Sequence, residues 1–125
     1  EEELWAIAPY LFEVDEAAFA WITQELWGTP WGFFILSDAT LDELRQHFRK
    51  FLTVRTPENE EWYFRFYDPR VLPTYLTPRT PAEVDEFLGP ARAVCVTNRA
   101  TYGVDVYARA TAAADPVRVT WVGAP

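Results

Sequence analysis

The segment TLDELRQHFRKF, residues 40–51, is the clearest helix signal in the chain. Thr40 followed by Glu43 is the pattern of a capping box, in which both side chains accept free backbone N–H groups. Acids follow Thr40, while Arg49 and Lys50 come at the end, so the charges complement the helix dipole. The segment therefore predicts an amphipathic helix that packs through one apolar stripe: Leu41, Leu44, Phe48 and Phe51.

The residues before this helix predict two strands and another helix. An apolar run bounded by acids, residues 5–14, is typical of a buried strand. Asp15 can cap a helix over residues 16–27, which Gly28 would end. The run WGFFIL, residues 31–36, predicts the second strand.

Two short runs after the helix predict an antiparallel hairpin. LTVRT (52–56) and WYFRFY (62–67) are separated by the turn-like segment PENEE. If the second run is a strand throughout, its side chains alternate between two faces. One face would carry Trp62, Phe64 and Phe66, and the other Tyr63, Arg65 and Tyr67.

The rest of the chain predicts helices and then strands. Asp68 and Pro69 suit the cap and first position of a helical turn, which Pro73 would keep short. Thr80 and Glu83 form a second capping box pattern, and the helix would stop at Gly89 and Pro90. Alternating segments at the end predict three strands: 91–97, 102–110 and 117–122.

This order predicts an α+β (mixed α/β) fold with a mixed, largely antiparallel sheet and about three helices packed on it. The chain has 125 residues, which suits one domain. It has no methionine and opens on Glu1-Glu2-Glu3, so we expect a piece of a longer translation product.

The composition of the chain excludes some kinds of binding partner. The net charge is −8, and an acidic chain repels phosphate groups, so we expect no nucleic-acid and no membrane partner. No apolar run approaches the roughly 20 residues of a membrane helix. The aromatic share is 17%, so either the core is rich in rings or some rings lie on a surface that a partner covers.

The sequence contains few side chains of the kinds that usually act in catalysis. His47 is the only histidine, and an i,i+4 contact with Glu43 explains it. Cys95 is the only cysteine and alternates with valines, as a small buried side chain would. A structural zinc site needs more ligands than these two. We therefore predict a protein that is not an enzyme, with no catalytic residue, no cofactor and no metal.

Five charged residues remain as candidates for partner binding. Arg45 and Arg49 form a like-charge i,i+4 pair, which is destabilising unless an acid lies over it. Arg65, Asp68 and Arg70 lie around the join of a strand and a helix, where a cation such as Arg70 is disfavoured by the helix dipole. Asp68 and Arg70 could form a structural bracket or a partner contact. We hypothesise that both groups bracket one segment of a partner.

Three segments carry a family resemblance: WGFFILSDATLDELRQHFRKFLTV, YFRFYDPRVL and FLGP before a strand. They resemble the effector-chaperone (adaptor) family of bacterial type VI secretion, long catalogued as a domain of unknown function. The likeness runs over residues 4–96. Carried onto this chain, the recurrent motif positions are Trp31, Gly32, Ser37, Leu44, His47, Arg49, Arg65, Tyr67, Asp68, Pro69, Arg70, Leu72, Gly89 and Pro90.

The resemblance implies a cytoplasmic, non-enzymatic adaptor that binds a cognate secreted effector and helps load it onto the VgrG spike protein. Residues 1–96 would form the adaptor core, whose usual first strand is missing here. Residues 97–125 would extend that domain or begin a second lobe. Two alternatives are a fused structural module of a larger effector or spike protein, and a small carboxylate-based enzyme.

Overall fold

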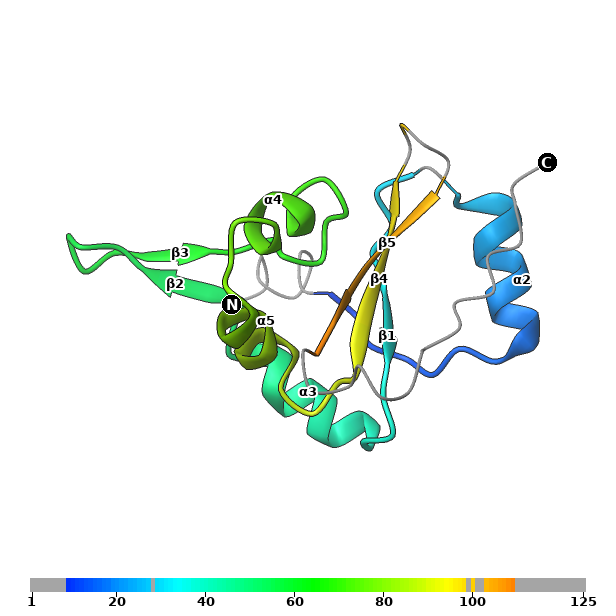
Figure 1. Ribbon diagram of the computed structural model, residues 1–125, viewed down its shortest axis with the longest axis horizontal. Helices are drawn as coiled ribbons and strands as arrows, with labels where there is room; N and C mark the ends of the chain where they lie inside the picture. The colour runs from blue at the N-terminus through cyan, green and yellow to red at the C-terminus, as the bar shows by residue number, and fades with distance from the viewer. Residues whose placement is uncertain (1–8, 28, 99, 101–102, 110–125) are drawn as a thin grey trace, which may run out of the picture.

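The structure is a computed structural model, which describes residues 9–27, 29–98, 100 and 103–109. It confirms the predicted α+β class (Figure 1). In chain order the described elements are α2 (Glu16–Glu25), β1 (Phe34–Leu36), α3 (Leu41–Arg49), β2 (Thr53–Arg55), β3 (Glu61–Tyr63), α4 (Leu72–Leu76), α5 (Pro81–Leu88), β4 (Ala93–Asn98) and β5 (Gly103–Ala108).

The described strands form two antiparallel sheets rather than one. The larger sheet has the order β1-β4-β5, with Phe34 opposite Cys95 and Cys95 opposite Val106. Strands β2 and β3 pair only with each other and project from the rest of the fold (Figure 1). The predicted hairpin is therefore confirmed, but it does not join the main sheet.

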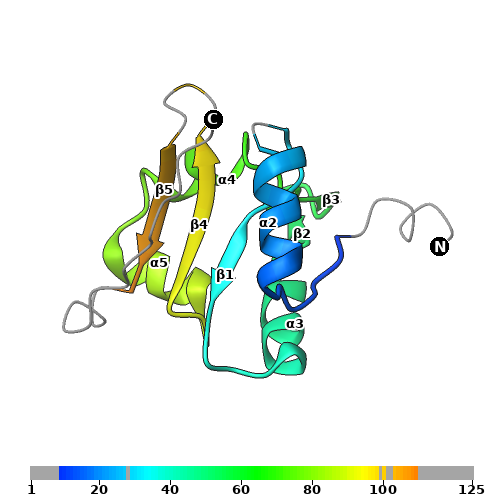
Figure 2. The same cartoon turned by 90° about the vertical axis from the view of Figure 1, so that its right-hand side faces the viewer.

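Helices lie on both sides of the larger sheet. Helix α2 packs beside β1, where the rings of Phe19 and Phe34 are 5.4 Å apart, while α4 and α5 lie behind β4 and β5 (Figure 2). Strand β4 is buried along most of its length, with Val94 and Val96 fully inaccessible. Each such side chain contributes about 1.5–3 kcal/mol through burial. Since β4 is the central strand of this sheet, its side chains lie in the middle of the core.

The core is rich in aromatic rings. The ring of Phe48, from α3, lies 6.1 Å from that of Phe66 and 5.5 Å from that of Phe87, which belongs to α5. Leu44 is buried as the stripe on α3 predicts, whereas Leu41 remains 38% exposed. Part of the high aromatic content thus lies in the core, where it packs α3 and α5 against the segment that follows the hairpin.

The three long helices begin at the predicted caps. Asp15 accepts a hydrogen bond from Ala18 N (2.7 Å), and Thr40 accepts one from Glu43 N (3.2 Å). Thr80 heads a full capping box at α5. These caps depend on neighbouring residues alone, which is why the sequence predicts them. In the described part of the chain, none of the helices combines the length and apolar character that crossing a membrane requires.

Several predicted strand bounds are wrong. Residues 9–14 form no strand, although a strand was predicted over 5–14; its first four residues lie outside the described part. Strand β3 ends at Tyr63, because Asp68 N donates to Arg65 O (3.1 Å) and turns the chain. The two-face alternation therefore fails, with Trp62 60% exposed and Phe66 buried.

Helix α4 starts later than predicted. It begins at Leu72 instead of Pro69, and Pro73 lies in its first turn, where a missing N–H is tolerated. Strand β5 pairs along the whole of β4, so residues 103–108 extend the sheet begun by β1. The predicted helix end at Gly28 and the predicted strand at 117–122 lie outside the described residues.

Candidate binding site

The turn between β3 and α4 presents a two-point ion pair. Arg70 Nη2 lies 2.7 Å from Asp68 Oδ2, and Arg70 Nε donates to Asp68 Oδ1 at 3.0 Å. The backbone N–H of Arg70 also donates to Oδ1, at 2.8 Å. Asp68 is therefore the anion that offsets Arg70, and it acts within a tight turn rather than as the predicted helix cap.

This pairing changes the acidity of Asp68. The hydrogen bond from the Arg70 side chain lowers the pKa of the Asp68 carboxyl, although burial opposes it. The Arg70 N–H and the charges of Arg70 and Arg65 lower it further. The Asp68 side chain is only 5% exposed, whereas the Arg70 side chain is 70% exposed. Asp68 thus fixes one edge of the guanidinium and leaves the other toward solvent.

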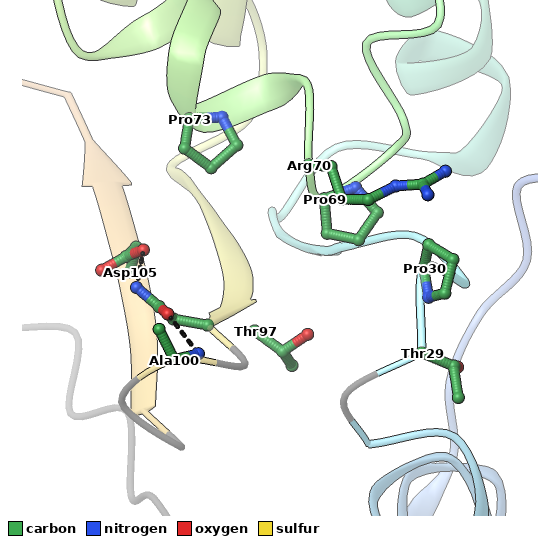
Figure 3. Close-up of a pocket in the computed structure, with 9 residues that line it drawn as sticks. Thr29, Pro30, Pro69, Arg70, Pro73, Thr97, Ala100 and Asp105 are labelled. Carbon is green, nitrogen blue, oxygen red and sulfur yellow. Dashed lines mark hydrogen bonds between the residues drawn. The ribbon is translucent and has the colours of Figure 1, made fainter.

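Arg70 borders an open hollow of about 370 Å³, which we call the Arg70 hollow (Figure 3). One wall comes from the turn before α4 and the loop before β1, and the other from the ends of β4 and β5. Asn98 Nδ2 donates to Asp105 Oδ2 at 3.1 Å and stiffens the second wall. The described lining residues are Thr29, Pro30, Pro69, Arg70, Pro73, Thr97, Asn98, Ala100 and Asp105.

The hollow is lined by both charged and apolar groups. Arg70 supplies a positive charge, Asp105 a negative one, and prolines a rigid apolar rim. In the part of the chain described, no three His, Cys, Asp or Glu side chains gather as metal ligands would. The sequence did not predict Thr97, Pro30 or Asp105 as lining residues, because they meet Arg70 only through the tertiary fold.

The other candidate arginines lie elsewhere. The Arg65 guanidinium lies over the Tyr67 ring, 5.7 Å from its centroid, and forms no ion pair with Asp68. Arg45 and Arg49 are exposed on α3 and form no ion pair with a described residue. No described hydrogen bond, ion pair or ring contact joins this pair to the Arg70 turn. The hypothesis that the two groups bracket one partner segment therefore stays a prediction, and the contact within it that the structure shows is the one between Asp68 and Arg70.

His47 has a different role from the one predicted. Instead of contacting Glu43, its Nε2 donates a 2.6 Å hydrogen bond to the carbonyl oxygen of Phe87, at the end of α5. The imidazole also lies against Gly89, where an added Cβ would overlap the ring. Gly89 has φ +55°, which disfavours other residues as well. His47 therefore joins α3 to α5.

Two further motif positions also hold the fold together. Ser37 Oγ donates to the carbonyl oxygen of Pro90 at 3.2 Å and accepts from Ala39 N at 3.0 Å. Gly32 is buried beside the backbone of Tyr67: a Cβ there would lie 3.9 Å from the carbonyl oxygen. Ser37 thus connects segments distant in sequence, Gly32 lies close to another such segment, and neither lines the hollow.

Cys95 is buried in the central strand, as predicted. Burial raises the pKa of its thiol, which disfavours the reactive thiolate. Cys95 lies between β1 and β5, and the neighbouring strands pack beside it on both sides.

These features define an α+β domain whose candidate site is a polar hollow bordered by an arginine–aspartate pair. The chain belongs to the DUF4123 family, described as a domain of unknown function, whose family model matches residues 1–86. No curated protein and no solved structure matches this chain significantly.

Proposed function

We propose that this chain is a non-enzymatic adaptor of bacterial type VI secretion, which binds a cognate effector in the cytoplasm and helps load it onto the VgrG spike protein. The observation that carries the proposal is membership of the DUF4123 family over residues 1–86, together with the adaptor-family motifs around the α3 helix and the Asp68–Arg70 turn. The structure adds physical support but does not name a partner.

The first support is the exposed pair on α3. Arg45 and Arg49 are one helical turn apart on an acidic chain, without an ion-pair partner among the described residues. Two such guanidinium groups repel each other, so an acidic partner segment would gain by lying across both. Arg70 offers a similar contact, because its Nη1 is not engaged by Asp68.

The second support is that three side chains of the kinds that enzymes use already have structural contacts. His47 is hydrogen-bonded to Phe87, Asp68 is ion-paired with Arg70, and Cys95 is buried with a raised thiol pKa. Each of these groups stabilises the fold in a way that local packing explains. A binding role needs only complementary surface, which the α3 arginines and the Arg70 hollow supply.

The test is co-expression of the full chain with the products of its neighbouring genes, followed by affinity purification. One product should co-purify with the wild type and be lost with Arg45→Glu. This change should not harm folding, because it replaces a like-charge pair with a Glu–Arg pair at i,i+4, worth about 0.2–0.5 kcal/mol. Arg70→Glu would be uninformative, since it would place a second carboxylate beside the buried Asp68.

Arg55→Glu is the control, because it makes the same charge change on the hairpin and should keep the partner. It also removes the hydrogen bond from Arg55 Nη1 to Asn59 Oδ1 (3.2 Å) and places a carboxylate opposite Glu61, so circular dichroism must show that the variant is folded. Loss of the partner in both variants would point to net charge instead of the α3 surface. If no neighbouring product co-purifies with the wild type, the adaptor proposal fails.

A further inference from the structure

The β2–β3 hairpin exposes one apolar face. Val54 and Trp62 are opposite each other in the antiparallel ladder, so their side chains share a face. They are 46% and 60% exposed. Within the described residues, Trp62 makes no hydrogen bond or ring contact outside the hairpin, which projects from the fold (Figure 1). A two-stranded hairpin is marginally stable alone in water, and an exposed tryptophan does little to stabilise it through burial. Folding alone therefore does not explain a tryptophan at this position.

A carboxylate lies at the edge of this face. Trp62 Nε1 donates to Glu60 Oε2 at 3.2 Å, which holds the acid beside the indole. Glu60 has no cationic partner in the described part of the chain. The hairpin as a whole is acidic, because Glu58, Glu60 and Glu61 outnumber Arg55, its only cation.

The turn makes this arrangement rigid. Asn59 N donates to Thr56 O and Thr56 N donates to Glu60 O, each at 2.9 Å. Asn59 adopts the left-handed conformation, with φ 65°, which asparagine tolerates. Hydrogen bonds therefore order the backbone that carries Glu60 and Trp62 before any partner binds, and less backbone conformational entropy is lost on binding.

We propose that Val54, Glu60 and Trp62, which we call the hairpin face, dock a basic segment of a partner protein. A lysine or arginine of that segment lies over the Trp62 indole, the most favourable ring for a cation, and donates to Glu60. Val54 packs against the apolar stem of the same side chain. An acidic segment or a nucleic acid would be repelled by the three glutamates.

This inference does not depend on the adaptor proposal, which concerns acidic partner segments at the α3 arginines. The probe is a short capped peptide in which lysine and valine alternate, added to the full ¹⁵N-labelled chain at physiological ionic strength. The Trp62 indole N–H signal is identified by its loss in Trp62→Phe. In the wild type this signal and the backbone amide signals of the hairpin should shift saturably. The same backbone amide signals give the affinity of the variants that lack the indole, and Trp62→Ala should weaken binding by about tenfold or more.

Matched variants separate this site from general attraction to an acidic protein. Trp21→Ala removes a tryptophan of similar exposure (57%) from α2 and should leave affinity unchanged. Glu60→Gln should weaken binding several-fold, and Trp62→Phe should bind with intermediate affinity. The remaining amide signals show whether each variant is folded.

Three outcomes would overturn the proposal. The first is the absence of a saturable shift in the wild type, and the second is a Trp62→Ala variant that binds the peptide as tightly as Trp21→Ala does. A Trp62 signal that moves with protein concentration alone would instead identify a second copy of this chain as the occupant. None of these results bears on co-purification of an effector, so failure of one proposal is distinguishable from failure of the other.

Discussion

The imidazole of His47 lies against Gly89 and fills the space that a side chain on residue 89 would need. The same ring donates its Nε2–H to the carbonyl oxygen of Phe87, two residues earlier. One histidine thus closes the C-terminal end of α5 and fixes α3 beside it. This contact explains two positions of the family motif in terms of folding, without any binding role.

Gly89→Ala should therefore destabilise the chain. The new Cβ would overlap His47 and would also sit on a backbone with φ +55° and ψ −117°, so we expect a loss of about 2–4 kcal/mol in the free energy of unfolding. Urea denaturation followed by circular dichroism measures it. In a His47→Ala background the additional cost of Gly89→Ala should be smaller, because only the backbone strain remains. Equal costs in both backgrounds would show that the overlap does not matter.

The Asp68–Arg70 pair should make stability depend on acidity. The folded-state pKa of Asp68 is lowered from its usual value of 3.8, so this pair stabilises the fold above that pH. The stabilisation is lost as the pH falls through 3.8 toward the folded-state value. Arg70→Met should be less stable at neutral pH and should lose less stability on acidification. Urea midpoints measured across this acidic range test the difference in slope.

Arg70→Lys is the control for this pair, since it keeps the charge but cannot donate in the fixed geometry of a guanidinium. Its stability and acid sensitivity should lie between those of the wild type and Arg70→Met. An acid response of Arg70→Met identical to that of the wild type would mean that Asp68 is not the responsible group.

The hairpin turn should tolerate glycine better than alanine at residue 59. Asn59→Ala places a Cβ-bearing residue without a compensating side chain in the left-handed region, at a cost of about 1–2 kcal/mol to the hairpin. Asn59→Gly also loses the hydrogen bond from Arg55 Nη1 to Asn59 Oδ1 (3.2 Å), but glycine adopts this backbone conformation without strain, so it should cost less than Asn59→Ala. Amide hydrogen exchange of the hairpin residues reports this local stability. Faster exchange in the glycine variant than in the alanine variant would contradict the turn geometry.

The Cys95 thiol should be unreactive in the folded chain. It is buried and its pKa is raised, so both access and the thiolate fraction are low. Reaction with a disulfide reagent should be at least about a hundredfold slower in buffer than in denaturant, because it requires local opening. Rapid labelling of the native chain would show that β4 opens readily.

Features that depend on near neighbours in sequence were predictable. The caps of α2, α3 and α5 rest on Asp15, Thr40 and Thr80, each of which bonds a backbone N–H three residues ahead. The buried position of Cys95 followed from its valine neighbours in the same way. Local hydrogen bonding and hydrophobic periodicity suffice for such features.

Features that depend on distant partners were not predictable. The end of β3 follows from the turn at Arg65 and from the packing of Phe66 against Phe48. The role of His47 depends on Phe87, which is forty residues away in the chain. The local pairing of Arg70 with Asp68 likewise appears only in the folded chain, while Arg45 and Arg49 are exposed on α3.

The sequence by itself determined the α+β class, the three capped helices and the acidic surface, because these follow from periodicity, caps and charge counts. Only the tertiary structure decided that Arg70 borders a hollow and that Trp62 lies exposed beside Glu60. The physical reason is that burial and ion pairing depend on which segments meet in space. Composition supplies the charged and aromatic side chains, and the fold selects which of them a partner can reach.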